Sequence, residues 1–172
     1  MVRKSAKRYT PRLSPLSRFG WLMELYAENY THFLQLFSQA PLTVGEYCLR
    51  GDDGLTLFVD VLACHSYTVE LRMTYPLIDP LTGQLDPSAY VRVYHDARQV
   101  EATHCYIGRS WQDAIGLYPP PALLIHHRLR MNIFLGKWLD YLWERGYGRH
   151  CLQVRQQPLD VVVRAGLNTG HR

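Results

Sequence analysis

The chain has 172 residues, of which 47% are hydrophobic and 20% charged, and its formal net charge is +4. This is the size of one ordinary domain, which buries roughly two thirds of its unfolded surface without disulfides or metals. Charged residues interrupt every apolar run well before the ~18 to 20 residues that a bilayer crossing requires. The sequence therefore predicts no membrane span.

The charge is unevenly distributed along the chain. Residues 1–18 hold six basic and no acidic residues, residues 145–172 hold five basic and one acidic, and the segment between holds eight basic and fourteen acidic. Basic ends around an acidic body argue against a basic nucleic-acid groove on the fold itself. The ends are either solvated tails or weak contacts to phosphate-rich surfaces. The basic residues that would make such a contact at the N-terminus are Arg3, Lys4, Lys7, Arg8 and Arg12.

The compartment and cofactors are predicted from the first residues and from the cysteines. Pro11 and Pro15, with basic neighbours, stand where a signal peptide needs an unbroken apolar run. The cysteines lie far apart with no C-x-x-C pair, which favours reduced thiols and a cytoplasmic protein. In Cys64-His65 and His104-Cys105, adjacent residues on a strand point to opposite faces, so neither dipeptide offers two zinc ligands. We expect no metal and no cofactor.

Residues 17–41 show the spacing of an amphipathic helix that Pro41 stops. An apolar stripe at three- and four-residue steps contains one amide, Asn29. A buried amide needs hydrogen-bond partners, so Asn29 is either a structural tie to a neighbouring backbone, which we favour, or part of a pocket. The stripe consists of Leu22, Leu25, Tyr26, Asn29, Phe33, Leu36 and Phe37.

Strand patterns follow. Residues 44–50 and 55–63 flank the turn Gly51-Asp52-Asp53-Gly54, which predicts a hairpin. Residues 66–75 then alternate apolar and polar side chains, which is typical of an antiparallel sheet covered on one face only.

Residues 89–106, "AYVRVYHDARQVEATHCY", predict a further hairpin. With residues 96–99 as the connection, we expect His95 opposite Val100, Val93 opposite Ala102, and Val91 opposite His104, all on one face. The other face would carry Arg92, Tyr94, Glu101 and Thr103.

The pair His95-Asp96 has three interpretations. It is a hairpin tip, a ligand contact or a catalytic dyad, and we favour the tip. In this register the two side chains project to opposite sides, and the turn leads Asp96 to bond its own loop amides. We therefore name no catalytic residue.

The strongest helix pattern lies after Pro121 and stops near Gly146. Its apolar stripe consists of Leu124, His127, Met131, Leu135, Trp138 and Leu142, widened by Phe134 and Leu139. We expect this helix to pack on the sheet.

Together these elements predict an α+β fold. It has an antiparallel meander sheet of about five strands, with an N-terminal helix and a long C-terminal helix packed on one face. Residues 1–18 form a basic N-terminal arm, residues 19–150 a single α+β domain, and residues 151–172 a loosely ordered basic tail.

Several motifs resemble the YqiB-like family of small uncharacterised bacterial proteins. They are "RYTP" at 8–11, the set Leu25, Asn29 and Tyr30, "VRVYHDA" at 91–97 followed by "VEA" at 100–102, and "RMNIFLGKWLDYL" at 130–142. The resemblance spans most of residues 8–146 and implies a proteobacterial, cytosolic protein of unknown function. It supplies no catalytic residues. The candidate binding positions on its motifs are Asn29, Arg92, Tyr94, His95, Asp96, Glu101 and Asn132.

Three functions remain open. The first, which we favour, is a non-catalytic binding or adaptor module with an unknown protein partner, which uses the open sheet face or the basic arm. The second is a small-ligand binder or enzyme with a pocket between helices and sheet, near Asn29, His95, His127 and Asn132. The third is nucleic-acid contact through the basic arm. The sequence contains no Gly-rich phosphate loop and no G-x-S-x-G or H-E-x-x-H motif.

Overall fold

The structure is a computed structural model that describes residues 17–37, 42–78, 83, 85, 87–106, 120–149, 152–155 and 162–163. The basic residues predicted to form the arm, Arg3 to Arg12, lie outside the described residues. The helices are α1 (Arg18–Phe37), α3 (Pro121–Glu144) and the short 3-10 helix η1 (Tyr147–Arg149). The strands are β1 (Gly45–Arg50), β2 (Thr56–Cys64), β3 (Thr68–Thr74), β4 (Leu77–Ile78), β5 (Ser88–Tyr94), β6 (Gln99–Tyr106), β7 (Gln153–Val154) and β8 (Val162–Val163).

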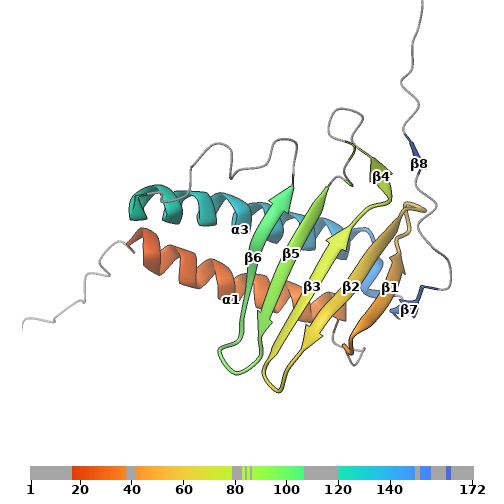
Figure 1. Ribbon diagram of the computed structural model, residues 1–172, viewed down its shortest axis with the longest axis horizontal. Helices are drawn as coiled ribbons and strands as arrows, with labels where there is room; N and C mark the ends of the chain where they lie inside the picture. The colour runs from red at the N-terminus through yellow and green to blue at the C-terminus, as the bar shows by residue number, and fades with distance from the viewer. Residues whose placement is uncertain are drawn as a thin grey trace, which may run out of the picture.

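The main sheet has six strands in the order β6-β5-β3-β2-β1-β7, and its neighbours are antiparallel (Figure 1). Five of them are the predicted strands in meander order, which confirms the α+β architecture. The sixth, β7, comes from the segment predicted to be a tail, and it pairs with β1 through Tyr47 and Val154. β4 and β8 form a separate parallel pair.

Helix α1 follows the predicted stripe, because all seven of its members are buried. The helix begins at Arg18, and the amide of Gly20 donates to Ser17 Oγ at 3.0 Å. A serine in this place satisfies one of the free amides at a helix N-terminus.

Helix α3 begins at Pro121, where the fixed backbone angle of proline suits the first helical turn. It ends before Gly146, whose φ of 79° is one that glycine adopts without strain. The buried face differs a little from the predicted stripe. Leu129 and Asn132 are buried, while Leu124 and His127 are only half-buried.

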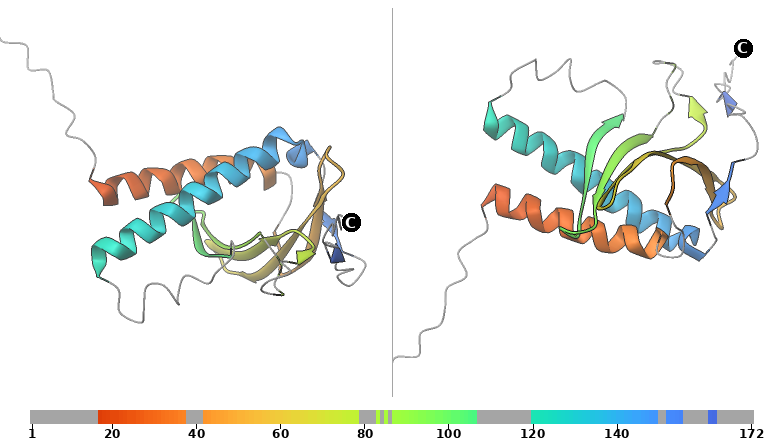
Figure 2. Two further views of the ribbon diagram at one scale, coloured as in Figure 1. Left: turned by 90° about the horizontal axis from the view of Figure 1, so that it is seen from above. Right: turned by 60° about the horizontal axis from the view of Figure 1, so that its bottom comes forward.

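Both helices lie on the same, concave face of the sheet and run in the same direction (Figures 1 and 2). Their N-terminal halves extend past the edge strand β6. There they pack on each other in a small apolar cluster of Leu22, Leu25, Tyr26 and Leu129. Among the described residues, no helix combines the length and hydropathy needed to cross a membrane.

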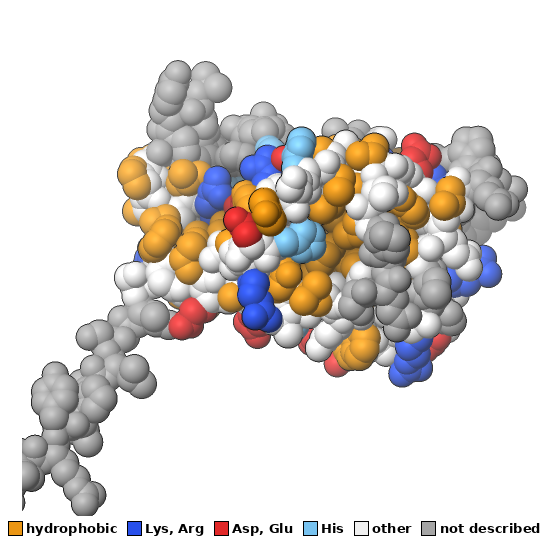
Figure 3. Space-filling view, turned by 90° about the horizontal axis from the view of Figure 1, so that it is seen from below, with side chains coloured by type: hydrophobic (Ala, Val, Ile, Leu, Met, Phe, Trp, Pro, Cys, Tyr) orange, Lys and Arg blue, Asp and Glu red, His pale blue; other side chains and the backbone are white. Residues whose placement is uncertain are grey.

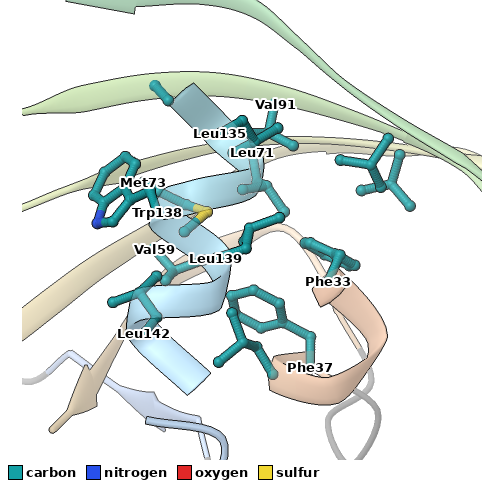
Figure 4. Close-up of a cluster of buried hydrophobic side chains, with 14 of the residues drawn as sticks. Phe33, Phe37, Val59, Leu71, Met73, Val91, Leu135, Trp138, Leu139 and Leu142 are labelled. Atoms are coloured by element: carbon teal, nitrogen blue, oxygen red, sulfur yellow. The ribbon is translucent and has the colours of Figure 1, made fainter. Parts of the chain in front are cut away.

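The main core lies between the helices and the sheet (Figure 4). Phe33 and Phe37 of α1 and Leu135 and Leu139 of α3 face strand residues such as Leu71, which is fully buried. Burial of one such side chain contributes roughly 1.5–3 kcal/mol. This face of each strand therefore holds the helices in place and leaves the opposite face to polar side chains.

The predicted pairing of the β5–β6 hairpin is wrong by two residues. Val93 lies opposite Val100 and Val91 opposite Ala102, so the connection is residues 95–98, closed by Arg98 with a φ of 53°. The register also shifts between Tyr90 and Val91, which places His104 opposite Tyr90. A β-bulge of this kind reverses the facing of the residues beyond it. We expected His104 on the same face as Val91, and this prediction is wrong, because His104 shares the face of Tyr90.

Candidate functional site

The seven candidate residues lie in three separate places. Asn29 and Asn132 meet between the two helices, Arg92, Tyr94 and Glu101 lie on the outer sheet face, and His95 and Asp96 lie in the β5–β6 loop. They therefore do not form one site.

The two buried asparagines tie three elements together. Asn29 Nδ2 donates to the backbone oxygen of Asn132 at 3.2 Å, which joins α1 to α3. Asn132 Oδ1 accepts the amide of Ala102 in β6 at 2.7 Å, and Asn132 Nδ2 donates to the oxygen of Arg128. Both side chains are 0% exposed. Asn29 is thus tied to a neighbouring backbone, as expected. The side-chain amide of Asn132 extends this connection to the edge strand β6.

The remaining oxygen of Asn29 faces Gly136. A Cβ at that position would lie 2.7 Å from Asn29 Oδ1, so a larger residue would force the asparagine side chain or the helix to shift. Asn29 Oδ1 has no hydrogen-bond partner among the described residues and is shielded from solvent. Beside this contact, Asn29 and Gly136 line a small pocket of about 220 Å³, whose other lining residues are Leu25, Glu28, His32, Ile133, Lys137 and Asp140. Asn29 is therefore both a structural tie and part of a pocket lining.

The outer sheet face carries cross-strand ion pairs. Arg72 contacts Asp60 at 2.6 Å, and Arg92 contacts Glu70 at 2.8 Å, in each case directly opposite its partner in the sheet register. Hydrogen bonding to Tyr94 is the largest cause of a raised pKa of Arg92. The charges on this face therefore compensate one another.

Glu101 connects this face with α3. Its Oε1 accepts the hydroxyl of Tyr94 at 2.9 Å, and its Oε2 accepts Arg128 Nη1, also at 2.9 Å. Glu101 is buried, and burial raises the pKa of Tyr94. Both carboxylate oxygens are used within the fold, so the network couples the sheet edge to the helix and leaves no free acid at this place.

His95 and Asp96 are exposed in the loop after β5, and they point to different partners. Asp96 Oδ1 accepts the amide of Ala97 at 2.8 Å, which is the local turn bond that we expected. The ring of His95 stands edge-on to Tyr30 of α1, with centroids 6.2 Å apart. No hydrogen bond joins the two side chains in the described structure, so the arrangement is not that of a histidine oriented by an acid.

His95 instead lines a pocket at this end of the molecule, with a volume of about 330 Å³. We call it the hairpin pocket, because the β2–β3 and β5–β6 turns meet α1 there. Its floor is apolar, with Phe33, Phe37 and Val69 almost fully buried. The residues that line it are Phe33, Leu34, Phe37, Leu42, Cys64, His65, Ser66, Val69 and His95. In Figure 3, which shows the molecule from below, hydrophobic side chains gather around a histidine on this face.

The rim of the hairpin pocket is polar and exposed. It consists of Cys64, His65, Ser66 and His95. The thiol of Cys64 lies 3.3 Å from the backbone oxygen of Leu42, to which it donates. An apolar floor with a few polar groups at its mouth is the usual composition of a small-ligand site. Of the four residues near which we expected a pocket between helices and sheet, only His95 lines this one, and Asn29, His127 and Asn132 do not.

Sequence reasoning missed most of this pocket. We weighed Cys64 and His65 only as zinc ligands, and Ser66 only as the first residue of the strand pattern 66–75. The sequence pattern that could have indicated the pocket is the short polar stretch Cys64-His65-Ser66 between two strand patterns. It does not show that His95 lies nearby. In the part of the chain that the structure describes, no three histidine, cysteine, aspartate or glutamate side chains are grouped to hold a metal ion.

A cluster of hydrogen-bonded and packed residues surrounds the Gly51–Gly54 turn. The sequence did not predict it. Tyr147 is fully buried, and its hydroxyl lies 3.2 Å from both Asp53 Oδ1 and the backbone oxygen of Leu55. The ring packs on Gly51, where an added Cβ would come within 2.2 Å of it. Burial raises the pKa of Tyr147 above its usual range. This cluster fastens the β1–β2 turn to the end of α3.

The fold and the pocket define a two-layer α+β protein, in which an antiparallel meander is covered on one face by two parallel helices that leave a pocket at the hairpin end. Residues 32–148 match the family described as "Protein of unknown function (DUF1249)". The match covers more than half of the chain, and the chain belongs to this family. It includes every residue that lines the hairpin pocket. A search of curated proteins found no match, and neither did a search of solved structures.

Proposed function

We propose that this protein is a non-catalytic binding protein that holds an apolar group of its ligand in the hairpin pocket. The observation that carries the proposal is the pocket itself. Its apolar floor is formed by α1 and β3, and its mouth is formed by two exposed turns. A volume of about 330 Å³ is at the lower end of the range for small-molecule sites.

The outer sheet face has weaker support as the binding surface. Asp60, Glu70 and Glu101 already pair with arginines there, so a partner would have to compete with existing ion pairs. The hairpin pocket, by contrast, has some apolar lining that is still accessible, mainly on the half-buried Leu34 and Leu42. Each methylene buried contributes about 0.8 kcal/mol, which is a factor of about four in affinity.

The test uses n-butanol, n-hexanol and n-octanol as probes of the pocket. Titration of the full chain, followed by two-dimensional amide NMR, should shift the signals of residues 33–37, 64–69 and 95. Affinity should rise about fourfold for each added methylene until the floor is covered. Alcohols that produce no shifts at these residues, or an affinity that does not depend on chain length, would contradict the proposal.

A matched pair of variants locates the binding. Leu34 lies on α1, lines the pocket and is half-buried, so Leu34→Gln should keep the helix and weaken n-octanol binding. Leu62, 48% exposed on β2, does not line the pocket. Leu62→Gln should leave n-octanol binding unchanged. Equal effects of the two changes would mean that the alcohol binds elsewhere.

We also propose that the protein works in the bacterial cytoplasm. The YqiB-like resemblance supports this location, and so does the scattered arrangement of its cysteines. Separation of a host cell into cytoplasmic, periplasmic and membrane fractions, with detection of the native chain, tests it. Recovery mainly in the periplasm would overturn this part of the proposal.

A further inference from the structure

We infer that the hairpin pocket selects ligands whose apolar chain ends in a carboxylate. This inference rests on the function proposed above and adds the chemical class of the ligand. It follows from the polar groups at the mouth of the pocket.

The mouth offers hydrogen-bond donors. His65 and His95 each carry at least one ring N–H, and Ser66 carries a hydroxyl. All three residues are exposed at the rim, and within the described residues no hydrogen bond occupies their side chains. The fourth rim group, the Cys64 thiol, is engaged with the oxygen of Leu42. Three unoccupied donor side chains therefore stand above an apolar floor.

The lining contains no acidic residue. Of its nine residues, only the two histidines and Cys64 are ionisable, so nothing in the pocket compensates a cationic ligand. Asp96 is next to His95 in the chain but is not part of the lining, and its Oδ1 accepts the amide of its own loop. An ammonium group, which only donates, would find no carboxylate here.

A carboxylate has the complementary chemistry. It only accepts hydrogen bonds, with about four lone-pair sites, and bonds to an ionised acceptor are stronger than neutral ones. Its attached chain can lie against the apolar lining, of which Leu34 and Leu42 are the most accessible residues, while the charged end remains at the exposed rim. The charge then stays in contact with water, so the desolvation cost is small.

The experiment compares three probes with the same chain: octanoate, n-octanol and n-octylamine. Octanoate should bind the full-length protein about tenfold more tightly than n-octanol, and n-octylamine should bind most weakly. If n-octanol binds in the pocket and octanoate binds no better, the inference is overturned while the proposed function stands. If none of the three binds, the proposed function itself fails.

Variants at the rim identify the donors. His65→Phe and His95→Phe keep a ring and remove its N–H groups, so each should reduce the preference for octanoate over n-octanol by about threefold. His95→Gln retains an amide donor and should recover most of the preference. His126→Phe changes an exposed histidine on α3, outside the pocket, and serves as the control.

Affinity for n-octanol shows in each variant that the pocket is intact, and thermal unfolding shows that the chain is folded. A preference for octanoate that survives the double change His65→Phe with His95→Phe would overturn the inference.

Discussion

The side chain of Asn132 in α3 accepts the backbone amide of Ala102 in β6 at 2.7 Å. β6 is the edge strand next to the helices, so this amide has no strand partner on that side. Open strand edges are sites of unwanted pairing between chains. The side chain of Asn132 thus accepts a hydrogen bond from a buried edge amide. Its backbone oxygen accepts a hydrogen bond from Asn29 Nδ2 of the other helix.

The first prediction concerns this contact. Asn132→Leu keeps the approximate size of the side chain but leaves the Ala102 amide buried without an acceptor, which costs roughly 1–3 kcal/mol. Urea unfolding should show this loss. Lys137→Leu, on an exposed position of the same helix, should change stability by about 0.5 kcal/mol or less. Equal midpoints for the Asn132 variant and the wild type would show that the tie contributes nothing.

The second prediction concerns the helix crossing at Gly136. Gly136→Ala adds a Cβ 2.7 Å from Asn29 Oδ1, and overpacking of this kind costs about 1–3 kcal/mol. Alanine also favours the helix by about 1 kcal/mol, so the net loss should be modest. In an Asn29→Ala background the clash is absent, and the same Gly136→Ala change should then stabilise the protein.

A double-mutant cycle of the four proteins, measured by chemical unfolding, isolates this coupling. The prediction fails if Gly136→Ala has the same effect whether or not Asn29 is present.

The third prediction compares two glycines of the β1–β2 turn. At Gly51 an added Cβ meets the buried ring of Tyr147 at 2.2 Å, whereas at Gly54 it meets nothing within 4 Å. Gly54 has a φ of 77°, so Gly54→Ala should cost about 1 kcal/mol of backbone strain. Gly51→Ala should cost clearly more, because the turn must detach from Tyr147. Thermal unfolding that ranks the two variants in the opposite order would refute this account of the turn.

The fourth prediction concerns cysteine reactivity. Burial raises the pKa of Cys105 to about 12, so at pH 8 only about one thiol in ten thousand is ionised. Cys64 is exposed. Cys105 is half-buried. With Cys151 changed to serine, iodoacetamide should modify Cys64 quickly and Cys105 much more slowly in the folded chain, as peptide mass spectrometry can measure. Equal rates of modification at Cys64 and Cys105 in the folded chain would contradict the raised pKa of Cys105.

The raised pKa of Cys105 also determines how the stability of the protein changes with pH. The pKa of Cys105 is higher in the folded chain than in the unfolded chain, so ionisation favours unfolding. Its contribution to stability is present at neutral pH and is lost as the pH rises from about 9 toward 12. A Cys105→Ala variant should lack this part of the alkaline loss.

The candidate site shows how far sequence reasoning reached. The faces of Arg92, Tyr94 and Glu101 were predicted, since alternation along a strand follows from backbone geometry. The cross-strand partners of these residues were not predicted correctly, because the register depends on which four residues form the loop. The face on which His104 lies depends on a β-bulge, and no residue pattern in this stretch predicts a bulge.

The sequence by itself determined the elements and their order. Apolar periodicity in residues 17–41 and after Pro121 specifies two helices, and alternation between them specifies the meander, because each element must bury one face. Only the tertiary structure decided what lies beside His95. The hairpin pocket combines residues from α1, two turns and β3, and their closeness depends on how the helices cross and how far the sheet curves. Those quantities are set by packing across the whole core, such as the Asn29–Gly136 contact, and local sequence patterns do not contain them.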